Sequence, residues 1–145
     1  MYFLGLDLGQ KRDHSAVAVV ERIDHRRAFQ GTAFQRLVVR YAERLPLGTP
    51  YPQVVERVRG IVRSQELASN CAVAVDATGV GAPVVDMLRA ARLGCDLTDV
   101  RASKGRVGAD GTGEHDDLVI ALALACWRAK RREFCGEVGH RLPGI

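Results

Sequence analysis

The chain has little lysine, few aromatic residues and no long apolar run. Only 3 of its 21 basic residues are Lys, and aromatic residues make up 6% of its 145 residues. The longest apolar run, residues 118–127, is shorter than the roughly 18 residues that a membrane span requires. The N-terminal MYFLGLDLG lacks the basic segment and cleavage site of a signal peptide. We therefore expect a cytoplasmic protein with no membrane partner.

Two missing motifs exclude further classes of function. The four cysteines are widely spaced and form no C-x-x-C pair, so we interpret them as reduced, mostly buried residues rather than zinc or dithiol ligands. No G-x-x-x-x-G-K-[ST] segment occurs, so ATP is not an expected partner. An actin-like sugar kinase also begins with a G-x-D-x-G strand turn, but it needs two such subdomains, for which 145 residues leave no room.

The composition is that of one globular domain. Hydrophobic residues make up 47% and charged residues 26%, with 15 Gly and 5 Pro. A chain of this length buries enough surface to form its own core. The net charge of +4 comes from an excess of Arg, whose planar guanidinium suits phosphate oxygens. Charge alone leaves two interpretations open, an anionic partner or the codon bias of a GC-rich genome.

Apolar patterning predicts eight elements in the order β-β-β-α-β-α-β-α. Short loops between the first three strands favour antiparallel pairing, and the apolar CAVAV segment is typical of a strand buried on both faces. The predicted strands are 2–8, 16–21, 36–43, 71–75 and 96–101, and the predicted helices start at 51, contain 84–91 and run from 114–117 to about 132. This order predicts an α/β fold with a mixed sheet, three antiparallel strands followed by parallel strands, and helices on both faces.

Four acidic residues stand out by their positions. Asp7 interrupts the first apolar strand, where an unpaired carboxylate is costly to bury. Asp76 ends the buried strand, at the edge where α/β sheets bind ligands, or it serves only as a turn residue. Asp116 and Asp117 open the last helix, where acids also act as ordinary N-terminal caps. If the first and fourth strands are neighbours, these carboxylates come within reach of a shared Mg²⁺ or Mn²⁺ ion.

The segments around these acids resemble a known family. They read GLDLGQKRDHSAVAVVE, AVDATGVGAPVVDML and GEHDDLVIALALACW. Together they are similar to the nuclease domain of the large terminase subunits of tailed phages, in the ribonuclease H-like superfamily that includes Holliday-junction resolvases. The resemblance implies that Asp7, Asp76 and one of Asp116 and Asp117 are catalytic residues that bind two divalent metal ions. Asp117 is favoured, because in related sequences an acid stands four residues before the A-L-A-L-A run that begins at Ala121.

The resemblance also implies a substrate and auxiliary residues. The family cleaves double-stranded DNA while the phage genome is packaged, which would place the chain in a bacterial host, phage or prophage context with packaging proteins as partners. His14 and His115 would assist proton transfer or hold the phosphate, unless they are ordinary surface residues. Candidate DNA contacts near the first acid and at the end of the last helix are Lys11, Arg12, Arg128, Lys130, Arg131 and Arg132. Basic residues at a helix C-terminus also stabilise the helix itself, which is an equal alternative for the last four.

The chain departs from the family in the segment between the second and third acids. Family members carry a further helix and a hairpin there, whereas residues 102–113 form only a short Gly-rich stretch. We therefore expect a single ribonuclease H-like nuclease domain over residues 1–145 that is shortened between its second and third acidic motifs. The alternative is a catalytically impaired remnant of the same fold that serves as a DNA-binding or assembly module.

Overall fold

The computed structural model describes residues 1–9, 13–26, 33–78, 82–101 and 116–131. It contains the eight elements in the predicted order. The strands are β1 (Tyr2–Asp7), β2 (Ala16–Arg26), β3 (Ala33–Arg44), β4 (Cys71–Asp76) and β5 (Asp96–Val100), and the helices are α1 (Tyr51–Val62), α2 (Ala82–Ala90) and α3 (Asp117–Lys130).

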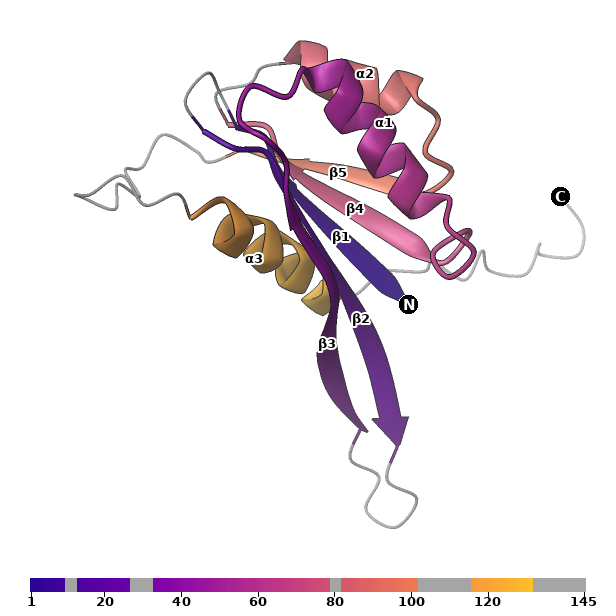
Figure 1. Ribbon diagram of the computed structural model, residues 1–145. Coiled ribbons are helices and arrows are strands. Elements are labelled where there is room, and N and C mark those ends of the chain that lie inside the picture. Colours follow the sequence, from indigo (N-terminus) through magenta and orange to yellow (C-terminus); the bar gives the residue numbers. More distant parts are fainter. Residues whose placement is uncertain (10–12, 27–32, 79–81, 102–115, 132–145) are drawn as a thin grey trace, which may run out of the picture.

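The five strands form one mixed sheet in the order β3-β2-β1-β4-β5. β2 pairs antiparallel with β1 and β3, whereas β4 pairs parallel with β1 and β5. Helices α1 and α2 cover one face of the sheet, and α3 lies on the other (Figure 1). The predicted α/β class, the mixed sheet of three antiparallel strands followed by parallel strands, and the helices on both faces are confirmed.

The face under α1 and α2 carries the main hydrophobic core. Alternate residues of the central strands point to this side, among them Leu4 and Leu6 of β1 and Val73 of β4, and all three are fully buried. They pack against residues such as Val58 of α1 and Leu88 of α2. Fully burying a Leu or Val side chain contributes about 1.5–3 kcal/mol, so this layer supplies most of the drive to fold.

The face under α3 is built from small residues. They are Gly5, Ala16, Ala18 and Ala72 on the sheet and Ala121, Ala125 and Ala129 on the helix. A Cβ atom on Gly5 would lie 1.9 Å from the carbonyl oxygen of Ala121 and 2.7 Å from the amide nitrogen of Ala125. Only glycine fits at this position, because any side chain would push the helix backbone away from β1. The small residues thus bring α3 unusually close to the sheet.

Two arginines fix the C-terminal half of α3. The Nη1 atom of Arg22 in β2 donates to the carbonyl oxygen of Ala129 at 2.9 Å, and its guanidinium lies 5.1 Å from the centre of the Phe3 ring. Arg128 is only 8% exposed and pairs with the carboxylate of Asp96 at the start of β5. These contacts fix the helix to β2 on one side of β1 and to β5 on the other.

The second and third strands are longer than predicted. The sequence predicted 16–21 and 36–43, whereas the hairpin continues to Arg26 and starts again at Ala33. Because Tyr2 of β1 pairs with Glu21, everything beyond that point in β2 extends past the end of β1 (Figure 1). This extension pairs only with β3, so it needs no buried face and lacks the apolar pattern that reveals core strands. Among the described helices, none is long and apolar enough to cross a membrane.

Candidate active site

Asp7 and Asp76 lie side by side at one edge of the sheet. Each is the last residue of its strand, and the parallel register of β1 and β4 pairs them directly. Neighbouring strands lie about 4.8 Å apart, so the two carboxylates start from adjacent backbone positions. Both follow the alternation of Phe3 and Ala72, which places them on the face covered by α3. The expected adjacency of the first and fourth strands is therefore present.

Asp117 approaches the same place from α3. It is four residues before Ala121 and so continues the buried stripe that faces the sheet, and it is 6% exposed. Asp116 is exposed and acts through its backbone, with its carbonyl oxygen accepting the Ile120 N–H at 2.8 Å. The helical spacing thus puts Asp117, rather than Asp116, on the side of Asp7.

The carboxylates interact strongly enough to change the protonation of Asp7. Burial is the largest cause that raises the pKa of Asp7 from 3.8 to about 7, and repulsion by Asp76 and then by Asp117 adds to it. The backbone N–H of Leu8 opposes the shift. A carboxyl group whose pKa is raised by burial and by neighbouring carboxylates marks a candidate functional site. Asp76 is oriented by the Thr78 N–H, which donates to its Oδ1 atom at 2.7 Å.

The chemistry of these groups fits a hard divalent cation. The Oδ2 atom of Asp117 is buried and has no hydrogen-bond partner among the residues that the structure describes, which is costly for a carboxylate oxygen. Mg²⁺ and Mn²⁺ prefer carboxylate oxygens and would satisfy this atom while relieving the repulsion at Asp7. Within the described ranges, no three His, Cys, Asp or Glu side chains already stand at metal-binding spacing. Asp7, Asp76 and Asp117 would therefore close further around an ion.

A fourth acid, Asp13, was missed by the sequence analysis. Its negative charge also raises the pKa of Asp7. The loop after β1 turns back on itself, because Gly9 has no side chain where a Cβ atom would lie 2.3 Å from the Asp13 carbonyl oxygen. The Gly9 N–H also donates to the Ser15 hydroxyl at 3.1 Å. No local sequence pattern distinguishes Asp13, because it is one more acid in a polar segment.

Of the predicted auxiliary histidines and the basic residues of the loop after β1, the structure describes His14. The Nδ1 atom of His14 donates to the Leu45 carbonyl oxygen at 2.8 Å, which ties the loop after β1 to the segment after β3. This contact gives His14 an anchoring role, and its predicted part in catalysis stays a prediction. His115, Lys11 and Arg12 lie outside the described residues.

The basic residues of α3 do not form one surface. Arg128 is buried against Asp96, which removes it from the expected phosphate contacts. The sequence allowed this correction, since Arg128 is 11 residues after Asp117 and so returns to the buried stripe after three turns. Lys130 and Arg131 are exposed, and the Arg131 guanidinium stacks 4.4 Å from the centre of the Trp127 ring. Arg132 lies outside the described residues.

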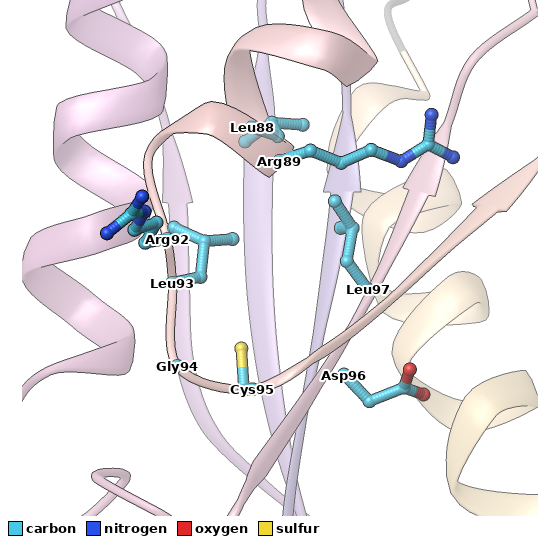
Figure 2. A pocket seen from close by; sticks show the side chains of 8 residues that line it. All are labelled: Leu88, Arg89, Arg92, Leu93, Gly94, Cys95, Asp96 and Leu97. Carbon is cyan, nitrogen blue, oxygen red and sulfur yellow. The ribbon is translucent and has the colours of Figure 1, made fainter.

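A separate cavity of about 500 Å³ lies far from the acids. It is formed where α2 leads into β5, and its lining includes Arg89, Cys95 and Asp96 (Figure 2). β5 runs parallel to β1, so this cavity is at the opposite edge of the sheet from Asp7. Arg89 pairs with Asp99 at 3.0 Å and Asp96 with Arg128, so two of the charged side chains that line the cavity form ion pairs within the fold.

No protein-family model matches the chain, and no curated protein matches it. Among solved structures, the chain is similar to the RuvC of Thermus thermophilus, with 18% sequence identity and a TM-score of 0.48. The match covers 86% of this chain and 90% of the RuvC chain. At this degree of likeness the comparison assigns no activity, and the function has to be argued from the residues of the chain itself.

Proposed function

We propose that the chain is a metal-dependent endonuclease that hydrolyses phosphodiester bonds of double-stranded DNA. The observation that carries the proposal is the register that pairs Asp7 with Asp76 on the face that α3 covers, where Asp117 is buried and its Oδ2 atom has no hydrogen-bond partner in the described part of the chain. Three carboxylates from distant parts of the sequence share one face at the edge of the sheet. The resemblance of the surrounding motifs to terminase nuclease domains supports the choice of substrate.

Each acid has a role that follows from its position. Asp7 is affected by the charges of both Asp76 and Asp117, and these three carboxylates would together hold the Mg²⁺ or Mn²⁺ ions. The bound ions would activate a water for attack on the phosphodiester and stabilise the leaving oxygen. Asp76 is held in place by the Thr78 N–H, and Asp117 by the close packing of α3 on Gly5. The backbone of the protein thus brings the three acids to one place, and their side chains would close further around a bound ion.

The biological context is part of the same proposal. The motif resemblance supports a role in phage DNA packaging, with duplex DNA as substrate and packaging proteins as partners. Lys130 and Arg131 are the described candidates for phosphate contacts, since both are exposed at the end of the helix that carries Asp117.

The test is cleavage of supercoiled plasmid by the purified protein. We expect linear and nicked products with Mn²⁺ or Mg²⁺ and none with EDTA. Asp7→Asn, Asp76→Asn and Asp117→Asn should each lower the rate by more than about a hundredfold, since losing even an outer partner of a metal ligand costs up to that much. Asp86→Asn is the matched control, because Asp86 is an exposed acid of α2.

The variants also separate the alternatives. A lower rate for Asp117→Asn than for Asp116→Asn would assign the third acid. Cleavage that persists in Asp7→Asn at the wild-type rate would refute the proposal. Absence of cleavage together with salt-sensitive DNA binding would instead identify an impaired remnant that binds DNA.

A further inference from the structure

The outer side of α3 is apolar although it faces away from the sheet. Val119 is 64% exposed, Ile120 39% and Trp127 37%, and Ala123 between them is also exposed. The inner side is apolar as well, because it carries the alanines that pack on β1 and β2. A helix that is apolar on all sides is normally covered on all sides. In the described part of the chain, no other helix or strand lies over this outer side (Figure 1).

The charges at the two ends of this outer side are complementary. Asp116 is exposed at the N-terminal end, and Lys130 is exposed at the C-terminal end. Both are seven residues from Ala123, so the arrangement reads the same about that position with opposite signs. Val119 and Trp127 are likewise each four residues from Ala123. When a second copy of the helix is set antiparallel to the first and centred on Ala123, Asp116 therefore lies opposite Lys130. Val119 likewise lies opposite Trp127.

We propose that the outer side of α3 binds the same surface of a second copy of this chain, with the two helices antiparallel and a two-fold axis at Ala123. Asp116 of each copy then faces Lys130 of the other, and Val119 packs on Trp127. The small Ala123 at the axis lets the helices approach to the 8–10 Å that helix pairs adopt. An isologous contact of this kind closes on itself and produces a dimer rather than a fibre.

The size of the surface sets the strength of the dimer. α3 has 14 residues and is about 21 Å long, so a pair of such helices buries less than a standard protein interface. We therefore expect a reversible dimer with a dissociation constant on the order of micromolar rather than nanomolar. Arg131 already stacks on one face of Trp127 in the same chain, which leaves the rest of the ring to the second copy. Asp117 stays on the inner side, so pairing leaves the acid cluster uncovered. In the dimer Lys130 contacts Asp116 of the second copy, which leaves Arg131 as the described candidate for phosphate contacts.

The first test is sedimentation velocity of the full chain with EDTA and without DNA. The wild type should change from monomer to dimer between about 1 and about 200 µM. Ala123→Glu puts two carboxylates together at the axis and should raise the dissociation constant more than about tenfold, because like charges in an interface are costly. Ala90→Glu is the matched control, since Ala90 is an exposed alanine of α2, and it should dimerise like the wild type.

The second test exchanges the charges. Asp116→Lys and Lys130→Glu should each weaken the dimer, because each sets like charges opposite one another. The double variant restores opposite charges and should recover wild-type association. A wild type that stays monomeric over the whole range, a dimer unaffected by Ala123→Glu, or a double variant no better than the single ones would each overturn the proposal. None of these results depends on nuclease activity, so failure here is separate from failure of the proposed function.

Discussion

Replacement of Asp7 by Asn should stabilise the metal-free protein while removing its proposed activity. The pKa of Asp7 rises from 3.8 to about 7 on folding, chiefly through burial and then through repulsion by Asp76 and Asp117. One pKa unit is 1.36 kcal/mol, so the full shift corresponds to about 4 kcal/mol. Asp7 is only half-buried and water screens part of the repulsion, so we expect about 2 kcal/mol. Asn has nearly the same shape without the charge.

The gain should appear in a defined pH window. Unfolded Asp7 ionises near 3.8 and folded Asp7 near 7, so between these values the folded protein binds the additional proton. The Asp7 contribution to the free energy of unfolding therefore falls as the pH rises from about 4 to about 7, and it stays low above that. Urea denaturation of wild type and Asp7→Asn with EDTA should show equal stability near pH 4 and a difference of about 2 kcal/mol at pH 8.

Two further measurements complete this experiment. Asp86→Asn, at an exposed site, should change stability by less than about 0.5 kcal/mol at every pH. Mg²⁺ or Mn²⁺ should stabilise the wild type and leave Asp7→Asn unchanged, because a bound ion stabilises only the folded state that holds it. If Asp7→Asn is no more stable than the wild type at pH 8, the inference that the ionised Asp7 carboxylate destabilises the folded protein is refuted.

Two other predictions concern the seating of α3. Gly5→Ala should lower the free energy of unfolding by about 1–3 kcal/mol, because the new methyl group would overlap the backbone of Ala121. Asp96→Ala should cost about 3 kcal/mol, since buried Arg128 loses its carboxylate, whereas Arg128→Met should cost less than about 1.5 kcal/mol because exposed Asp96 returns to water. Chemical denaturation measures all three variants.

The chain offers a control for Gly5→Ala, and the Asp96 and Arg128 variants are compared with each other. Gly60→Ala in α1 has nothing within 4 Å of the new methyl group, so it should raise stability by about 0.5–1 kcal/mol. A similar gain in Gly5→Ala would show that α3 does not lie close to β1. Equal costs for Asp96→Ala and Arg128→Met would show that the pair behaves as an ordinary surface ion pair rather than as an ion pair with a buried guanidinium.

The order of the elements could be predicted because each core element carries its own periodicity. β4 is apolar at every position from Cys71 to Val75, and α1 repeats its apolar residues at helical spacing. The extension of the hairpin beyond Glu21 could not be predicted, because past Arg22, which contacts α3, its two strands pair with each other and carry no apolar alternation. The bulge in β2 between Val19 and Val20, where the register with β3 shifts, could not be predicted either, because no local residue pattern marks it.

The candidate site was predictable where it depended on strand ends. Asp7 and Asp76 each follow an apolar strand, and the structure pairs them. Asp13 escaped notice because it belongs to a polar loop, where one more acid has no distinctive context. Arg128 shares the basic helix end with Lys130 and Arg131, but its spacing of 11 residues from Asp117 places it on the buried side of α3, where it pairs with Asp96.

The alanine stripe of α3 has a consequence for the register of the helix. Ala121, Ala125 and Ala129 repeat every four residues, so a slide of one turn, about 6 Å, would set alanine on nearly the same small residues again. Methyl packing alone therefore does not choose between neighbouring registers. The polar contacts of Arg22 and Arg128 do, and they lie about 17 Å along the axis from Asp117. The contacts at the C-terminal end of α3 thus determine where Asp117, at its N-terminal end, is placed.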